Sequence, residues 1–293
     1  VGSVVIEGEK IQEVIEGDGA PAAVCDEQID AQGCFLLPGV IDDHVHFRDP
    51  GLTHKADMAT ETAAAAAGGV TSFMDMPNCT PQTTTLEALE NKFKDAATKC
   101  IVNYSFYFGA TNNNADQLKA LDKTHVCGVK LFMGASTGNM LVDRMEALKK
   151  IFSEAGMLIA THCEDQQIIR ENTERFKQQY GEDLDISFHP LIRSEEACYH
   201  SSALAVQLAK ETGARLHILH ISTARELGLL EDRPLHEKKI TAEACVSHLM
   251  FCDEDYAQLG ARIKCNPSIK TKADRDALRK ALSTNLIDVI ATD

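Results

Sequence analysis

The sequence predicts an α/β protein, a (β/α)8 barrel of the TIM type with a small accessory β unit at its N-terminus. Three observations support this class. Eight short apolar runs alternate with amphipathic segments from residue 39 onward. The chain has 293 residues, of which 44% are hydrophobic, and a barrel of this kind takes ~250 residues. Strand-like segments without helices between them occupy residues 1–38. We therefore expect two units, residues 1–38 and residues 39–293.

The N-terminal segment has the pattern of short strands separated by turns. The stretches SVVIEG, KIQEVIEG and FLLPG contain β-branched and large apolar residues, with Gly at their ends. A unit of this size is too small to be stable by itself, so we interpret it as part of a small β domain.

Each predicted barrel strand is an apolar run, at residues 40–47, 69–76, 101–109, 128–134, 156–163, 215–222, 240–246 and 287–293. The predicted helices have apolar residues three and four positions apart, or are rich in Ala and end on Gly. They occupy residues 54–69, 85–99, 142–156, 202–214 and 272–285. Buried strands that alternate with crossover helices form a parallel sheet. Eight such strands favour a closed barrel.

Composition narrows the possible partners and location. The formal net charge of -15 disfavours nucleic acid and anionic membranes, which an acidic surface repels. There is no apolar run of ~18 residues and no signal peptide. The ten cysteines contain no C-x-x-C pair, which is typical of reduced thiols. We therefore expect a cytoplasmic protein with a small-molecule substrate, and a homo-oligomer is possible.

Both ends of the chain resemble cut ends. The sequence begins inside an apparent strand and stops at Asp293, directly after another one. We expect the C-terminal part of the barrel to be missing from this sequence.

Ionisable residues stand at the carboxyl ends of five predicted strands. In a parallel barrel these ends open on the same face, where active sites are built. The residues are His44 and His46 on the first strand, Lys130, His162, His220 and Asp293. We predict that they converge.

The spacing of His44 and His46 indicates a metal site. Residues two apart on a strand point to the same side, and neutral imidazole is a common zinc ligand. The alternative is a pair of hydrogen-bonded core histidines. His162 and His220 suit a second ion, whereas His217 falls on the opposite face of its strand and is interpreted as structural.

Lys130 and Asp293 each allow several interpretations. Lys130 lies in an apolar strand, where an unpaired ammonium is costly to bury. It could pair with a carboxylate, extend to the rim, or be a reactive amine that takes up CO₂ as a carbamate and bridges two cations. Asp293 could be a metal ligand, a proton carrier or a helix cap.

Three further residues are candidates for substrate binding. The planar guanidinium of Arg48 suits a carboxylate, and Asn78 and Asn266 follow strands two and seven. The alternatives are a surface ion pair for Arg48 and turn residues for the two asparagines.

These motifs, taken in order, resemble the amidohydrolase superfamily and, within it, the dihydroorotases. The matching stretches are PGVIDDHVHFRDPGLTH, AAAAAGGVTSFMDMPNCTPQTT, GVKLFMG, THCED, HILHIS, CNPSIKTKADRDAL and IDVIATD. The combination of FRDPG with MPN favours dihydroorotases over hydantoinases and allantoinases, which share the metal motifs. The family's His-Ala-Pro-His segment after the aspartate is not in this sequence.

The resemblance implies a mechanism. Two Zn²⁺ ions would be held by His44, His46, His162, His220 and Asp293, and bridged by carboxylated Lys130 and a hydroxide. Asp293 would be the catalytic acid and base. His46, Arg48, Asn78 and Asn266 would contact the substrate, dihydroorotate or N-carbamoyl-L-aspartate. Manganese, cobalt and iron also suit these ligands. A hydantoinase- or allantoinase-like cyclic amidase and a non-catalytic scaffold protein are the alternative functions.

Overall fold

The computed structural model describes residues 1–22, 24–134 and 138–293, and the chain divides into two compact units, Val1–Gly39 and Val40–Asp293. In the first unit, β1 (Gly2–Glu7) pairs antiparallel with β2 (Lys10–Glu16). The FLLPG stretch, predicted as a strand, has no strand conformation. The sheet of this unit consists of β1 and β2, and a strand needs a hydrogen-bonded neighbour, which this stretch does not have among the described residues.

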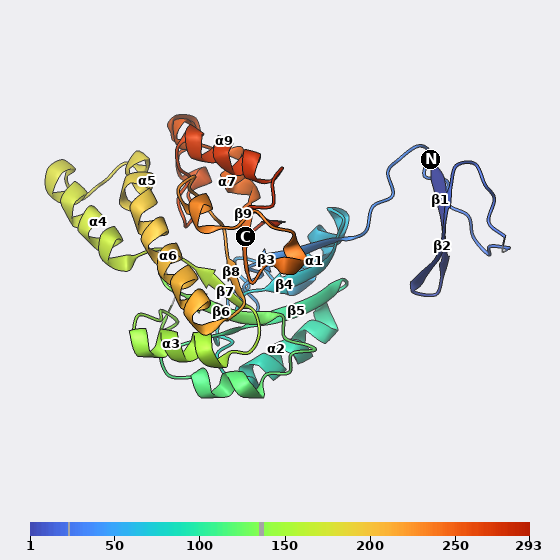
Figure 1. Ribbon diagram of the computed structural model, residues 1–293, viewed down its shortest axis with the longest axis horizontal. Helices are drawn as coiled ribbons and strands as arrows, with labels where there is room; N and C mark the ends of the chain where they lie inside the picture. Colours follow the sequence, from blue (N-terminus) through green and yellow to red (C-terminus); the bar gives the residue numbers. More distant parts are fainter. Residues whose placement is uncertain (23, 135–137) are drawn as a thin grey trace. The chain divides into compact units, whose positions relative to one another are not determined.

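The second unit is a nearly closed barrel of eight parallel strands, in the order in which they occur along the chain (Figure 1). The strands are β3 (Val40–Val45), β4 (Val70–Asp75), β5 (Asn103–Gly109), β6 (Gly128–Phe132), β7 (Ile159–His162), β8 (Leu216–Ile218), β9 (Ile240–Cys245) and β10 (Val289–Ala291). Each lies within one of the eight predicted runs, so the predicted barrel is confirmed.

The seam between the first and last barrel strands is closed by hydrogen bonds from the chain end. The backbone N–H of Asp293 donates to the carbonyl of His44 at 2.9 Å. The hydroxyl of Thr292 donates to Oδ2 of Asp42 at 2.6 Å. Asp293 is thereby brought beside the histidines at the end of β3.

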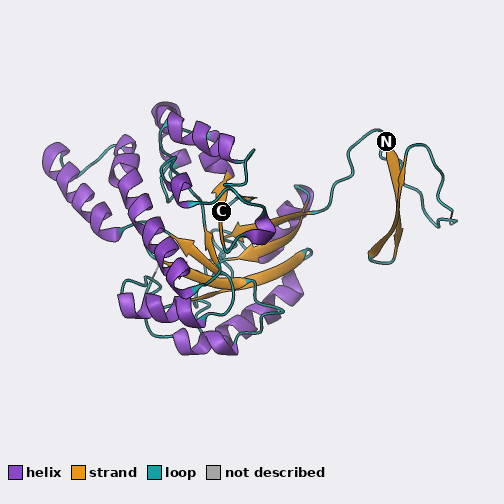
Figure 2. Ribbon diagram, in the orientation of Figure 1, coloured by secondary structure: helices purple, strands orange, loops and turns teal. Residues whose placement is uncertain are grey.

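Helices lie around the barrel strands, and one of them, at residues 166–180, projects away from the strands (Figure 2). They are α1 (Met58–Ala67), α2 (Leu86–Lys99), α3 (Met145–Glu154), α4 (Gln166–Tyr180), α5 (His189–Ile192), α6 (Glu195–Thr212), α7 (Val246–Met250), α8 (Tyr256–Leu259) and α9 (Lys272–Ala281). Short 3-10 turns occupy Ala115–Ala120, Ile186–Phe188, Glu226–Leu229, Leu235–Glu237, Asp253–Asp255 and Gly260–Ile263. The five predicted helices are confirmed. Helix α4 was not predicted, because its sequence is mostly polar and none of its residues is fully buried.

Strand alternation separates the hydrophobic core from the barrel interior. Val129 and Leu131 of β6 join the main core between strands and helices. Because successive side chains on a strand point to opposite faces, Lys130 faces the interior. The same alternation places Val45 and Phe47 in the core and turns His44 and His46 inward. Among the described residues, no helix is long and apolar enough to cross a membrane.

Candidate metal centre

Three side chains at the seam of the barrel converge on one point. Nε2 of His44 lies 3.3 Å from Nε2 of His46. Oδ1 of Asp293 lies 3.2 Å from the first nitrogen and 3.0 Å from the second. Tetrahedral coordination at ~2.0–2.1 Å separates ligand atoms by about 3.3 Å. The three atoms are therefore spaced as ligands of one ion would be.

Two more histidines form a second group beside the first. Nδ1 of His162 lies 2.9 Å from Nε2 of His220. The ring of His220 lies 5.4 Å from that of His44, centre to centre. One ligand atom each from His44, His220 and Asp293 lie within 4.8 Å of one another. The two groups together make one candidate metal site.

Hydrogen bonds to the outer ring nitrogens fix which nitrogen of three histidines faces the site. Nδ1 of His44 is 2.6 Å from Oε1 of Glu243, and Nδ1 of His46 is 2.7 Å from Oδ1 of Asn78. Nε2 of His162 is 2.8 Å from Oε2 of Glu164. These oxygens accept hydrogen bonds, so the opposite nitrogens carry lone pairs toward the site, as metal-ligating histidines do.

The electrostatics of the second group also fit a cation. Burial lowers the pKa of His162, and burial together with His162 lowers that of His220 well below the usual value. Nδ1 of His162 and Nε2 of His220 lie 2.9 Å apart, and two neutral imidazoles at the same site suit a divalent cation. Burial would raise the pKa of Asp293, but His44 and His46 hold it well below the usual range, so this residue stays a carboxylate.

Lys130 is buried beside these histidines without a counter-ion. Its side chain is 1% exposed, and burial lowers its pKa to about 8. Within the described residues its ammonium has no hydrogen bond or ion pair, and its one assigned contact is the ring of Phe132, 4.7 Å away. The carboxylates of Asp293 and Glu243 only partly oppose this lowering of the pKa. A buried amine with a lowered pKa has the neutral fraction that carbamate formation requires.

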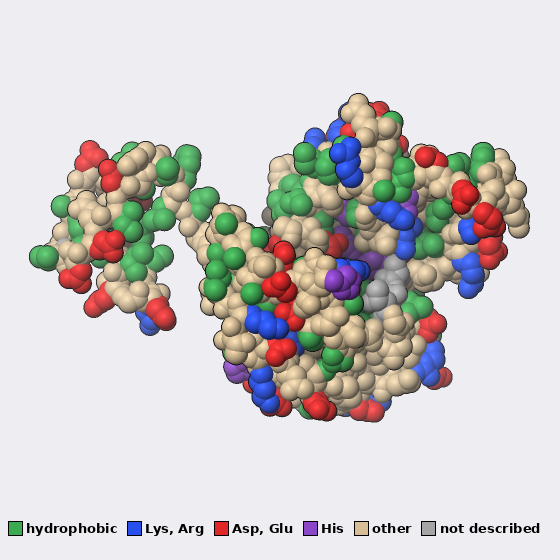
Figure 3. All heavy atoms as spheres, turned by 180° about the vertical axis from the view of Figure 1, so that it is seen from behind, with side chains coloured by type: hydrophobic (Ala, Val, Ile, Leu, Met, Phe, Trp, Pro, Cys, Tyr) green, Lys and Arg blue, Asp and Glu red, His purple; other side chains and the backbone are tan. Residues whose placement is uncertain are grey.

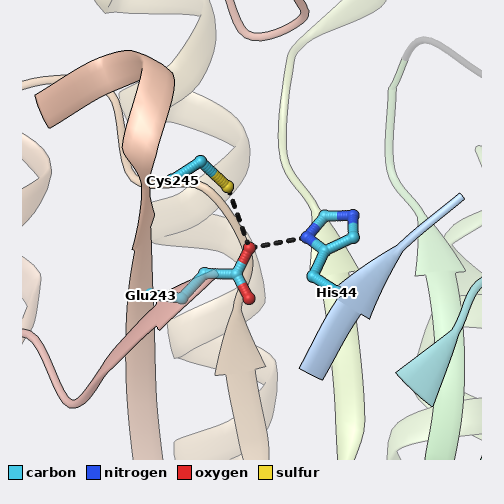
Figure 4. A group of neighbouring side chains, drawn as sticks. All are labelled: His44, Glu243 and Cys245. Atoms are coloured by element: carbon cyan, nitrogen blue, oxygen red, sulfur yellow. Dashed lines mark hydrogen bonds and ion pairs between the residues drawn. The ribbon is translucent and has the colours of Figure 1, made fainter. Parts of the chain in front are cut away.

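A third group of possible ligands does not fit a metal. His44, Glu243 and Cys245 lie together at the ends of β3 and β9 (Figure 4). The separation of 2.6 Å between Nδ1 of His44 and Glu243 is too short for two ligands of one ion and is that of a hydrogen bond. Glu243 therefore supports His44 from behind.

A cavity of about 510 Å³ opens onto the site. Its lining includes every predicted site residue except His44: His46, Arg48, Asn78, Lys130, His162, His220, Asn266 and Asp293. Figure 3 shows histidine side chains in a hollow on this face of the barrel unit. Glu61, Cys265 and Phe132 also line the cavity and were not predicted.

Arg48 is half-buried at the cavity wall with its charge unpaired. Its backbone is in the left-handed region, at φ 61°. The guanidinium forms no ion pair or hydrogen bond with any residue in the described ranges, so the predicted alternative of a surface ion pair is wrong. A half-buried guanidinium without a carboxylate suits an anionic ligand.

The two asparagines differ in how they are held. Oδ1 of Asn78 accepts from His46, which leaves its amide nitrogen for the cavity. Asn266 is exposed, but its loop is fixed on both sides. Nε2 of His189 lies 2.9 Å from the carbonyl of Cys265, and Nε2 of His248 lies 2.9 Å from that of Pro267. These two histidines therefore hold the loop that presents Asn266.

Sequence reasoning missed the supporting carboxylates. Glu164 and Glu243 are fully buried; Glu164 contacts His162 and Arg193, and Glu243 contacts His44 and His217. Although burial would raise the pKa of Glu243, His44 and His217 hold it well below the usual range. An acidic residue inside an apolar run, as in ITAEACV, was the available signal.

Strand alternation predicted that His217 faces away from the histidine cluster. The structure shows instead that its side chain points to the same side as the cluster. Leu216 and Ile218 pack into the main core, so His217 faces the interior and contacts Glu243 at 3.3 Å. Strand β8 ends at Ile218, and the backbone of His220 has φ 37°. The alternation therefore stops before His220, and both histidines point inward.

Comparison with known proteins agrees with this geometry. The model of the amidohydrolase family matches residues 35–293. The chain belongs to the amidohydrolase family. Members of this family generally bind metal ions, and this chain has candidate ligand groups for them.

Named relatives within the amidohydrolase family carry more than one activity. An allantoinase from Deinococcus radiodurans is 32% identical over 299 residues, covering 98% of this chain and 64% of the relative. A dihydroorotase from Methanosarcina mazei is 33% identical over 301 residues, covering 99% and 64%. The solved L-hydantoinase (dihydropyrimidinase) from Arthrobacter aurescens has a TM-score of 0.92 at 26% identity, covering 100% of this chain and 65% of that one. This amidohydrolase chain spans a little under two thirds of the length of these relatives.

Proposed function

We propose that this amidohydrolase is a dihydroorotase, which interconverts N-carbamoyl-L-aspartate and L-dihydroorotate. The observation that carries the proposal is Arg48, which lines the cavity at the histidine cluster and whose guanidinium has no ion pair within residues 1–22, 24–134 and 138–293. Dihydroorotate has a ring carboxylate, whereas hydantoin and allantoin have none. The guanidinium of Arg48 could pair with the carboxylate of dihydroorotate, whereas hydantoin and allantoin offer it no carboxylate.

His44, His46 and Asp293 would hold one ion and His162 and His220 the other, and carboxylated Lys130 would complete the proposed ligand set. Bound divalent cations, proposed here as zinc, supply Lewis-acid polarisation of the amide carbonyl and lower the pKa of water. The remaining roles belong to the chain's own side chains.

Ring opening needs a water to lose a proton and the ring nitrogen to gain one. A carboxylate of Asp293 takes the proton from the attacking water and returns it to the leaving nitrogen. Its low pKa keeps it deprotonated, the form that a proton acceptor must have. Arg48 binds the substrate carboxylate, and the amides of Asn78 and Asn266 orient the ring. Ring closure uses the same groups in reverse.

A panel of substrates tests the proposal directly. The full-length protein with bound zinc is expected to hydrolyse L-dihydroorotate much faster than allantoin or hydantoin. Preference for allantoin would favour the activity named for the Deinococcus radiodurans relative. Zinc binding without turnover of any of the three would favour a scaffold protein.

The Arg48→Ala variant should raise KM for dihydroorotate by about 10- to 100-fold, because charge-assisted hydrogen bonds contribute ~1.5–3 kcal/mol. Zinc content should stay the same, since Arg48 holds no metal. Steady-state kinetics and metal analysis check both expectations. Arg225→Ala, which removes an exposed arginine paired with Glu196, is the control and should leave KM unchanged. Equal KM values in the two variants would remove the role assigned to Arg48.

A further inference from the structure

Glu243 is a fully buried carboxylate that touches both halves of the histidine cluster. It lies near the end of β9. Its Oε1 atom accepts hydrogen bonds from His44, near the end of β3, and from His220, just after β8. It lines no part of the cavity. The mechanism above leaves it without a role in substrate binding.

The first contact of Glu243 is with His44. The 2.6 Å separation between Oε1 and Nδ1 is short for a nitrogen–oxygen hydrogen bond and is typical of charge-assisted ones. The bond requires a hydrogen on Nδ1, so Nε2 of His44 keeps its lone pair toward His46 and Asp293. The carboxylate thereby selects the tautomer that can bind a metal.

The second contact is with the backbone at His220. The N–H of His220 donates to the same Oε1 at 2.9 Å. This residue has φ 37°, in the left-handed region that is strained for a side chain with a Cβ. The hydrogen bond holds the turn after β8 in the conformation that points the imidazole toward His162.

The carboxylate of Glu243 is itself held in place by His217. Its other oxygen, Oε2, lies 3.3 Å from Nε2 of His217. Nδ1 of His217 lies 2.8 Å from the hydroxyl of Thr241. The imidazole therefore fixes the rotation of the carboxylate and keeps Oε1 on His44 and His220.

We propose that Glu243 is a positioning residue that couples the two metal positions, setting the tautomer of His44 and the backbone turn of His220 through one oxygen atom. This inference rests on the metal site of the proposed function. It goes beyond that site, because it predicts that one residue outside the ligand set controls the affinity of both positions.

The test is zinc affinity of the metal-free protein, measured by competition with a chromophoric chelator. Glu243→Met removes both acceptors at similar size and should weaken zinc binding by about 10- to 100-fold, the range for groups that orient metal ligands. Glu243→Gln should restore most of the affinity, because its amide oxygen still accepts from His44 and His220.

Glu226→Met is the matched control. Glu226 is also buried, but it accepts hydrogen bonds from the hydroxyls of Ser202 and Thr223 and from no imidazole among the described residues. The same substitution there should leave zinc affinity unchanged. Wild-type affinity in a folded Glu243→Met variant would overturn the inference.

A second measurement decides the matter if Glu243→Met does not fold. Long-range ¹H–¹⁵N spectra of histidine in the metal-free wild-type protein report which ring nitrogen carries hydrogen. We expect a hydrogen on Nδ1 of His44, with the peak assigned by its loss in His44→Asn. If Nδ1 of His44 carried no hydrogen, the inference would be contradicted. Neither measurement uses dihydroorotate, so a different substrate would refute the proposed reaction and leave this coupling intact.

Discussion

The Lys130→Ala variant is expected to lose bound zinc and activity together. Lys130 is buried among the candidate ligands and has no ion pair with any described residue, and we propose that its carbamate would bridge the two ions. Removal of the bridge should lower kcat by about 100-fold or more, because Lewis-acid polarisation contributes several kcal/mol to catalysis. Metal analysis and dihydroorotate hydrolysis measure the two losses.

Two controls separate loss of the bridge from general damage. A short carboxylic acid such as acetate should restore part of the activity of Lys130→Ala. It should leave the activity of the wild-type protein unchanged. Labelling with ¹³C-bicarbonate should give a carbamate carbon signal in the wild-type protein that is missing from the variant. Full zinc occupancy in Lys130→Ala would refute the bridging role.

The Lys92→Met variant should be destabilised by about 3–5 kcal/mol, the usual cost of removing one partner from a buried ion pair. Nζ of Lys92 lies 2.5 Å from Oδ2 of Asp75, and both side chains are at most 1% exposed. The other oxygen of Asp75 accepts from the backbone N–H of Phe47 at 2.8 Å. The pair thus joins α2 to β4 and to the loop that carries His46 and Arg48. Urea denaturation measures the free energy of unfolding.

Lys94→Met provides the comparison on the same helix. Lys94 pairs with Glu90, and both side chains are about two-thirds exposed. Exposed pairs of this kind contribute ~0.3–0.5 kcal/mol, so the unfolding midpoint should hardly change. Equal midpoints for the two variants would mean that the Asp75–Lys92 pair does not stabilise the barrel.

The sequence by itself was sufficient for the barrel and for the inward direction of His44, His46 and Lys130. The reason is local: a strand alternates its side chains, so flanking apolar residues such as Val129 and Leu131 report which way the residue between them points. The eight apolar runs and the helices between them likewise follow from periodicity. The family resemblance rested on short motifs that need no coordinates.

Only the tertiary structure decided which groups stand behind the histidines. Glu243 is 199 residues from His44 in the sequence, and its role follows from a contact between strands. Glu164 is only two residues from His162, but its role follows from the burial and the direction of its side chain, which folding decides. The inward position of His217 depends on where β8 ends, and the turn at His220 depends on an acceptor from β9. Alternation is a property of one strand, whereas tautomers and turns are set by the neighbours that folding supplies.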